Sequence, residues 1–356
     1  MEPKVIKDIC DLPEILKHRQ WDAVVSIGGT CQVAYQIKRL GLRAFSGPFD
    51  WLFSTEPDMV TEVLDKDFEG WLLRENLHEE PSQTECRRII DDKYHMIHQH
   101  IFPADRTYEE SYDDVKKIVD RRVGRFLSFK EGNKDILFVR TNLTSEEAKM
   151  MGEVIERRYG ANAYLLVMNH TKDHEVRMLP QVRENVFSFE IFDENENTGQ
   201  RWQGFDEHWD IVFANISLKG QDVLDLRRDV LFEGVYSYEQ DAEGKSFRWA
   251  TKDVTIDISR FAGKTIKLDL VCPVDNKLEI TDDKGKRLAK CAFGKVNPIE
   301  KISTGKSRID ARLIDVKLSS DAGKIRLVCK NDWVPSPEDQ RKLAMCIRSV
   351  TAVSDK

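Results

Sequence analysis

Two short apolar runs enclose a helical segment near the middle of the chain. Asp135–Arg140 reads Asp-Ile-Leu-Phe-Val-Arg, and Ala163–Met168 reads Ala-Tyr-Leu-Leu-Val-Met. Ser145 is a candidate N-cap for the segment between them, and Glu146 and Glu147 favour the positive end of a helix. Strand, helix and strand in this order predict a right-handed βαβ unit of a parallel sheet.

Further runs extend this sheet through the first half of the chain. Ala23–Ile27 is apolar, ends in two glycines and is followed by apolar residues at helical spacing, with Thr30 as N-cap and Gly41 at the C-cap. We also expect strands over 186–191 and 211–215, and a mostly helical or irregular region over 50–130. The pattern predicts an α/β domain over residues 1–222, with a mostly parallel sheet and flanking helices.

From about residue 228 the pattern changes to short strands and turns. Period-two alternation separated by Gly, Asp or Asn predicts strands over 254–258, 265–271, 277–280, 311–314 and 324–329. This spacing is typical of an antiparallel β-sandwich, which we place over residues 228–356.

Composition limits the function classes. A chain of 356 residues with 40% hydrophobic and 33% charged residues is long enough for two cores. The formal charge of −7 disfavours a general affinity for nucleic acid. The chain has no apolar run of roughly 18 residues, as a membrane span requires, and its N-terminus lacks the apolar stretch of a signal peptide. We therefore expect a cytoplasmic protein, whose oligomeric state remains open.

Cysteine usage agrees with a reducing compartment. The seven cysteines are an odd number without metal-type spacing, so most are expected to be buried apolar residues. Cys31 differs, because Ser26-Ile-Gly-Gly-Thr-Cys-Gln32 places it after a strand and at the start of a helix. There, unpaired N–H groups and the helix dipole favour the nucleophilic thiolate. The alternative is a structural cysteine.

A cysteine nucleophile needs a base and an orienting group. The densest histidine cluster is His95, His98 and His100; we expect a single one of them near Cys31 as base, and no metal there. Asp50 lies between aromatic residues and would orient a histidine or bind an arginine; the alternative is a turn residue or helix cap beside Pro48. The residues expected to form the substrate site, with N–H groups near the glycines available to an oxyanion, are Ser26, Gly28, Gly29, Gln32 and Trp51.

Several ordered motifs resemble one bacterial family, the papain-like cysteine peptidases of uncharacterised specificity. The motifs are DAVVSIGGTCQ at 22–32, LGLR at 40–43, PFDW at 48–51, HIF at 100–102, Arg121-Arg122 with Arg125-Phe-Leu127, and ILFVR at 136–140. The resemblance covers roughly residues 20–215 and implies Cys31 as nucleophile and His100 as base. The βαβ pattern departs from the papain arrangement, and no glutamine stands at the usual oxyanion position upstream of Cys31.

Gly-Thr-Cys-Gln after a strand is also similar to a shorter motif, Gly-Asn-Cys-Gln, of bacterial capsule-polysaccharide acetyltransferases. That resemblance implies coenzyme A as acyl donor and a sugar hydroxyl as acceptor. Arg122, Arg125 and Arg140 would then anchor phosphates, since arginine suits bidentate phosphate recognition. Under the peptidase reading no cofactor is expected.

The C-terminal half resembles the β-sandwich appended to many bacterial glycosyltransferases. The motifs are Tyr238-Glu239, Phe247-Arg-Trp249, Trp333-Val-Pro335 and Asp339-Gln-Arg-Lys-Leu343, with Ala344 in place of the usual glycine. The alternative is that Trp249 and Leu343 are core residues and that Arg341 pairs with Asp339 or Glu239.

Three function classes therefore stay open. The first is a cysteine-dependent hydrolase or acyltransferase acting through Cys31 on a peptide or glycan substrate. The second is a glycosyltransferase-like, glycan-modifying enzyme in which Cys31 is structural and the arginines bind phosphate. The third is a non-catalytic carbohydrate-binding protein.

Overall fold

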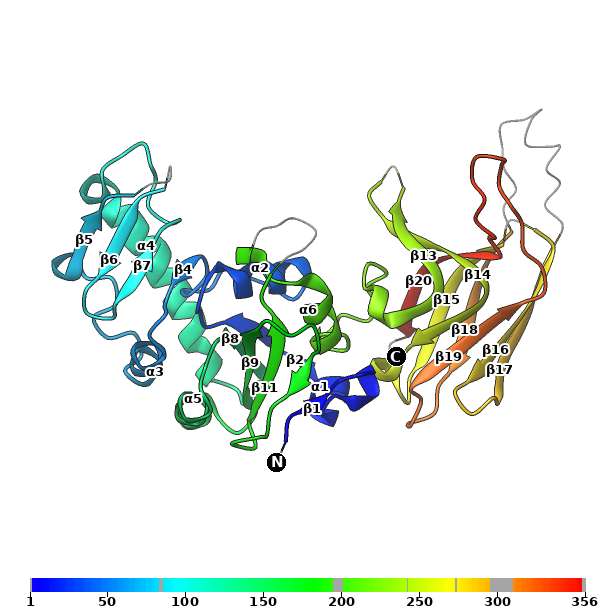
Figure 1. Ribbon diagram of the computed structural model, residues 1–356, viewed down its shortest axis with the longest axis horizontal. Coiled ribbons are helices and arrows are strands. Elements are labelled where there is room, and N and C mark those ends of the chain that lie inside the picture. Colours follow the sequence, from blue (N-terminus) through cyan, green and yellow to red (C-terminus); the bar gives the residue numbers. More distant parts are fainter. Residues whose placement is uncertain are drawn as a thin grey trace. The chain divides into compact units, whose positions relative to one another are not determined.

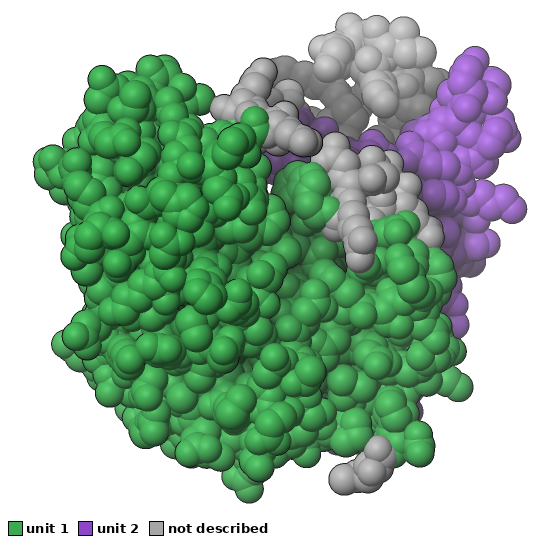
Figure 2. Space-filling model, turned by 60° about the vertical axis from the view of Figure 1, so that its left-hand side comes forward, with its two compact units in different colours: residues 1–11, 20–213 green, residues 12–19, 214–356 purple. Residues whose placement is uncertain are grey.

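The computed structural model describes residues 2–82, 86–194, 201–241, 243–272, 274–294 and 310–353. The chain divides into two compact units, coloured separately in Figure 2. Unit 1 comprises residues 1–11 and 20–213, and unit 2 comprises residues 12–19 and 214–356. The division after residue 213 therefore lies slightly before the region in which the sequence predicts it, and a short N-terminal segment groups with unit 2.

Unit 1 is built on a six-stranded sheet with the order β1-β10-β11-β9-β8-β3. The four strands β3, β8, β9 and β11 are parallel, whereas β10 and β1 add an antiparallel edge. The predicted parallel sheet and strand–helix–strand unit are confirmed. The bounds are β1 Lys4–Val5, β3 Ala23–Ser26, β8 Ile136–Thr141, β9 Ala163–Thr171, β10 Arg177–Met178 and β11 Val186–Phe192.

Helices cover both faces of this sheet (Figure 1). Side chains of α4 and α5 form one continuous core with Val25, Phe138 and Leu165, which point to the same face of adjacent strands. Figure 1 shows α2 and α6 on the other side of the sheet from α5. The helices of unit 1 are α2 Cys31–Arg39, α3 Pro57–Asp65, α4 Tyr108–Leu127, α5 Ser145–Tyr159 and α6 Asp206–Val212.

Local capping explains where these helices begin. Thr30 is the N-cap of α2, as predicted, and its side chain accepts a hydrogen bond from the Gln32 backbone N–H. For α5 the predicted cap is wrong by one residue. Thr144, not Ser145, forms a capping box with Glu147, which satisfies two backbone donors reciprocally.

One prediction for unit 1 is incomplete and one is wrong. The region over 50–130 is mostly helical or irregular, as expected, but it also contains a four-stranded antiparallel sheet with the order β4-β7-β6-β5. Its strands are too short to give a clear alternation: β4 Leu52–Phe53, β5 Leu77–Glu80, β6 Arg88–Asp91 and β7 Met96–His98. The strand expected over 211–215 is instead the end of α6 and the turn after it. A short apolar run that is buried all round cannot be assigned by periodicity alone.

Unit 2 contains an antiparallel sheet with the order β17-β16-β19-β14-β20-β15-β18, and β13 pairs with β14. Strand β14 joins two layers, because residues 253–257 pair with β19 whereas residues 248–250 pair with β20. The five predicted strands and the antiparallel β-sandwich class are confirmed. The bounds are β13 Phe232–Gln240, β14 Ser246–Asp257, β15 Thr265–Cys272, β16 Asn276–Asp282, β17 Arg287–Phe293, β18 Asp310–Lys317, β19 Lys324–Cys329 and β20 Met345–Val353.

The early segment of unit 2 is the short helix α1, Glu14–His18. Its Leu16 is fully buried, and the His18 Nδ1 atom lies 3.2 Å from the Ser259 carbonyl oxygen. The remaining short strands are β2, Gln20–Trp21, and β12, Ser217–Leu218. Among the residues described, no helix combines the length and apolar character that a membrane crossing requires.

Candidate active site

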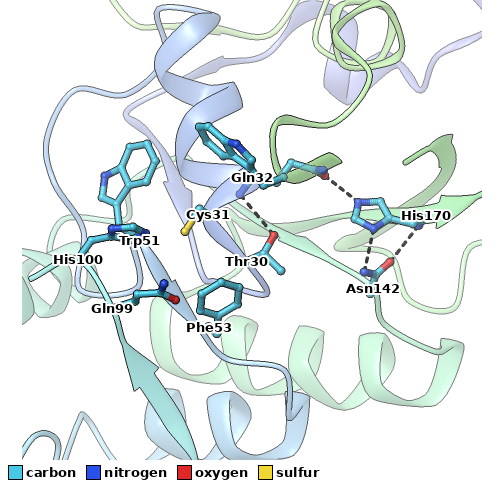
Figure 3. A pocket seen from close by; sticks show the side chains of 10 residues that line it. Thr30, Cys31, Gln32, Trp51, Phe53, Gln99, His100, Asn142 and His170 are labelled. Carbon is cyan, nitrogen blue, oxygen red and sulfur yellow. Dashed lines mark hydrogen bonds between the residues drawn. The ribbon is translucent and has the colours of Figure 1, made fainter. Parts of the chain in front are cut away.

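A cavity of about 910 Å³ opens beside the N-terminus of α2 in unit 1. Cys31 follows β3, Asn142 follows β8, and His170 lies near the end of β9, so three neighbouring parallel strands direct residues to it. The carboxyl ends of parallel strands are the usual place for a ligand site in an α/β sheet. The lining residues are Thr30, Cys31, Gln32, Trp51, Phe53, Gln99, His100, Asn142, His170 and Trp202 (Figure 3).

The loop before Cys31 is held in a conformation that needs glycine. Gly28 and Gly29 have φ angles of +86° and +96°, and a Cβ atom on Gly29 would clash with Thr141 Oγ1. The Gly29 N–H donates to Ser54 Oγ at 2.9 Å, and the Gly28 N–H lies 3.4 Å from Ser26 Oγ. Both N–H groups are thus engaged within the protein, which does not favour them among the N–H groups near this turn as oxyanion donors.

Arg140, on β8, holds the same loop through hydrogen bonds. Its guanidinium donates to the Ile27 carbonyl oxygen at 2.9 Å, to Ser54 Oγ at 3.2 Å and to the Ser54 carbonyl oxygen. The side chain is 1% exposed, and burial lowers its pKa to about 10. The expectation that Arg140 binds a substrate phosphate is wrong, because its donors are turned to the loop and away from solvent. Ser26 is likewise buried and supports the turn.

Cys31 is the first residue of α2 and is 6% exposed. Burial raises the pKa of its thiol to about 11, with a smaller raising influence from Cys86. Loss of hydration therefore outweighs the helix dipole, and the thiol is protonated at neutral pH. This reverses the expectation that position at the helix N-terminus makes Cys31 a thiolate.

This pKa predicts the pH dependence of alkylation at Cys31. Only the thiolate reacts, so the rate with iodoacetamide should rise about tenfold per pH unit from pH 8 to pH 10. An ordinary thiol with a pKa of about 8.5 would level off within this range. Peptide mass spectrometry at a series of pH values measures the rate at each cysteine separately. A plateau for Cys31 below pH 8 would contradict the protonated resting state.

Among the three histidines considered from the sequence, His100 lines the cavity. In Figure 3 the Cys31 sulfur points toward the side of the cavity where His100, Gln99 and Trp51 lie. The His100 Nδ1 atom is 3.4 Å from the sulfur of Cys86. A second thiol therefore lies beside the candidate base, a neighbour that the sequence analysis did not identify.

The other two histidines of that cluster have different surroundings. His95 lies on the surface and forms an ion pair with Glu56 at 2.8 Å, which raises its pKa. His98 is buried against Trp71, and loss of hydration lowers its pKa to about 4. Neither is among the described residues that line the cavity. No three ligand-type side chains converge as a metal site within the described part of the chain.

A second histidine in the cavity, His170, is absent from the sequence predictions. Its Nε2 atom is 2.7 Å from Gln32 Oε1, and its Nδ1 atom is 3.1 Å from Asn142 Nδ2. Because an amide oxygen only accepts and an amide nitrogen only donates, Nε2 carries the proton and Nδ1 accepts. Asn142 Oδ1 also accepts from the His170 backbone N–H at 2.9 Å. Both ring nitrogens are thus engaged, and His170 fixes the side chain of the residue next to Cys31.

Asp50 does not contact a histidine. Its carboxylate accepts from Arg43 Nε at 2.9 Å, from Arg43 Nη2 at 2.7 Å and from the Gly47 N–H at 2.9 Å. Burial raises the pKa of Asp50, and Arg43 opposes that rise. Of the two partners considered from the sequence, the structure shows arginine, and Asp50 is not among the described lining residues. Its role as an orienting group for a catalytic histidine is therefore not supported.

The remaining predicted residues divide into two groups. Gln32 and Trp51 line the cavity, whereas Arg122 and Arg125 lie on α4 beside the Arg43–Asp50 pair. Three further lining residues were not predicted: Phe53, Gln99 and Trp202, whose ring packs edge-on against Tyr35. Asn142 and His170 could have been inferred, because each follows or ends a strand that the sequence predicts.

Comparisons with known proteins point to the same part of the chain. Residues 22–178 match the profile of a family described as "Putative papain-like cysteine peptidase". Uncharacterized protein R408 of Acanthamoeba polyphaga mimivirus is 22% identical over 217 residues, which cover 54% of this chain and 96% of the viral protein. The matched region contains Cys31, His100, Asn142 and His170 of this chain.

Solved structures give weaker similarities. The C-terminal CBM6 of the laminarinase LamC from Zobellia galactanivorans is 12% identical, with a TM-score of 0.22, over 35% of this chain and 90% of that one. The carbohydrate binding module CBM6cm-2 of Cellvibrio mixtus lichenase 5A is 10% identical, also with a TM-score of 0.22, over the same shares of the two chains. Superpositions at this level carry no information about ligands.

Proposed function

We propose that the cavity is the active site of a cysteine hydrolase of the peptidase type, with Cys31 as nucleophile and His100 as general base. One observation carries the proposal: Cys31 begins α2 at the cavity wall, and its sulfur points toward the side on which His100 lies. A nucleophile and a base that face one cavity are the minimum set for covalent acyl transfer. The family match to residues 22–178 supports the same reaction class.

Because the resting thiol is protonated, the base must act during the attack. His100 accepts the thiol proton as the sulfur forms a bond to the acyl carbon, and the resulting imidazolium then protonates the leaving group. The bond to the leaving group breaks and a thioester to Cys31 remains. Water, deprotonated by the same imidazole, attacks the thioester, and the thiol leaves with that proton. At the end of these steps the Cys31 thiol and the His100 imidazole are regenerated.

The developing negative charge on the acyl oxygen needs a hydrogen-bond donor that lines the cavity. The N–H groups of Gly28 and Gly29 donate within the loop, so we assign this role to the side-chain amide of Gln99, which lines the same cavity as Cys31. Donors fixed before the reaction stabilise such charge without reorganisation.

Aromatic side chains on the cavity wall favour an apolar portion of the substrate. Trp51, Phe53 and Trp202 contribute to a lining that is largely apolar, which is typical of small-molecule and side-chain pockets. Water is our preferred acceptor. The alternative acceptor, a sugar hydroxyl with coenzyme A as donor, predicts the release of free coenzyme A.

The two reactions can be separated directly. The protein would be incubated with a peptide library, analysed by mass spectrometry, and in parallel with acetyl-coenzyme A, with free thiol measured over time. Cleavage that disappears in Cys31→Ala supports the hydrolase. Release of coenzyme A that depends on Cys31, without peptide cleavage, would replace it by a transferase. Turnover that persists in Cys31→Ala would reject the proposed nucleophile.

A further inference from the structure

Four arginines of unit 1 come together from two segments that are far apart in sequence, and one of these segments continues to Trp51 of the cavity. Arg121, Arg122 and Arg125 lie in the last turns of α4, and Arg43 lies in the loop after α2. We refer to Arg43, Arg122 and Arg125 as the arginine cluster. Its members belong to unit 1, as does the whole cavity.

Direct contacts fix the two segments together. The Arg125 guanidinium lies 5.4 Å from the centre of the Phe45 ring, two residues after Arg43 in the same loop. The Phe45 ring also packs against Phe129 at 5.4 Å, just beyond the end of α4. The loop from Arg43 to Asp50 therefore lies over the C-terminal part of α4, and the arginines of both segments meet there.

The positive charge of this group is only partly compensated. Asp50 is already bonded to Arg43 through two nitrogen atoms. Among the described residues, no hydrogen bond or ion pair joins the guanidinium of Arg122 or Arg125 to a carboxylate. Arg122 is half-buried, and loss of hydration lowers its pKa; the Asp50 carboxylate opposes this, whereas Arg43, Arg121 and Arg125 add to it. The dipole of α4 favours cations near its C-terminus, but an exposed cation gains the same stabilisation. The dipole therefore does not explain why Arg122 is half-buried.

One residue connects the cluster to the cavity. The Arg43 guanidinium lies 5.9 Å from the centre of the Trp51 ring, and Trp51 lines the cavity that contains Cys31. Trp51 directly follows Asp50 and has a φ angle of +63°, an uncommon value for tryptophan. The backbone thus turns sharply between the carboxylate that holds Arg43 and the ring that faces the cavity.

We propose that the arginine cluster binds an anionic group, a carboxylate or a phosphate, of the substrate whose acyl carbon reaches Cys31. This inference rests on the proposed function and narrows it to negatively charged substrates. For a peptide substrate the group would be an acidic side chain or a terminal carboxylate. Guanidinium groups bind both anions through paired N–H donors. They are also weakly hydrated, so little free energy is needed to remove their water when an anion binds. The sequence predicts that Arg140 also binds the anion. In this proposal Arg43, and not Arg140, is the third arginine that does so.

Alkylation of Cys31 by two reagents of similar size tests the cluster without requiring turnover. Iodoacetate is an anion and iodoacetamide is neutral, so the ratio of their rates reports the local potential and cancels the thiol pKa. In Arg125→Gln and in the double variant Arg122→Gln/Arg125→Gln, we expect this ratio at Cys31 to fall about threefold or more. Lys149→Gln, which removes an exposed charge on α5, is the matched control and should leave the ratio unchanged.

Added anions then identify the group. Inorganic phosphate or acetate, compared with chloride at equal ionic strength, should lower the ratio in the natural protein and not in the double variant. An effect of phosphate alone assigns a phosphoryl group, and an effect of acetate as well assigns a carboxylate. A ratio that both arginine variants leave unchanged, or that Lys149→Gln lowers equally, overturns the proposal. Because Arg125 is exposed, the single variant tests the cluster even if the double variant does not fold. Absent peptide cleavage would instead reject the proposed function.

Discussion

Replacing Cys31 with alanine is expected to lower turnover of a cleaved peptide by about 10⁴-fold or more, since no other group can form the thioester. His100→Gln should lower it by about 10²- to 10⁴-fold, the usual contribution of a general base. His170→Gln should cost less, about tenfold, because both of its ring nitrogens hold neighbours and neither accepts the thiol proton. Initial rates with one cleaved peptide measure all three.

Two further observations separate these roles. Cys346→Ala is the matched control, because Cys346 is also buried and its pKa is also raised, to about 12, but it lies in unit 2. It should leave turnover unchanged. A greater loss in His170→Gln than in His100→Gln would transfer the base role to His170.

Gly29→Ala is expected to destabilise unit 1 by about 3 kcal/mol, the sum of a left-handed backbone cost and a steric clash. The φ angle of Gly29 is +96°, and an added Cβ would meet Thr141 Oγ1 and the Thr141 carbonyl oxygen. In a unit of about 200 residues this corresponds to a fall in Tm of roughly 6–12 °C. Differential scanning calorimetry measures the change.

The same substitution in a helix provides the comparison. Gly124 lies within α4, and an added Cβ there would meet nothing within 4 Å. Gly124→Ala should therefore stabilise the protein by about 0.5–1 kcal/mol. A Gly29→Ala protein as stable as Gly124→Ala would show that the loop can relax, and the rigid support attributed to Ser54 and Arg140 would then be wrong.

The sequence predicts the strand, turn and helix that carry Cys31 better than it predicts which other side chains line the cavity. Strand β3, the two glycines, Thr30 and α2 follow from apolar runs, glycine conformations and capping, which are local effects. The short strands of the second sheet in unit 1 have two to four residues, so they depend on pairing between distant segments, which no local pattern reveals. His100 was predicted by resemblance, and its place in the cavity depends on that sheet.

The chemistry of individual side chains depended on burial that the sequence does not give. The thiol of Cys31 has a raised pKa because its surroundings exclude water, although the helix N-terminus alone predicts the opposite. Asp50 and Arg140 are charged residues whose partners, Arg43 and backbone carbonyls, are settled only by tertiary packing. Buried charges must find partners, but the sequence does not say which.

The discontinuity of unit 2 has a consequence for synthesis of the chain. Residues 12–19 leave the ribosome about two hundred residues before the strands with which they belong. During translation α1 therefore exists without its partners for the time taken to make some two hundred residues, and the segment Ser259–Phe261, which it contacts, is made only after that interval. Unit 1 can therefore be complete while unit 2 still lacks its strands, so we expect unit 1 to fold first.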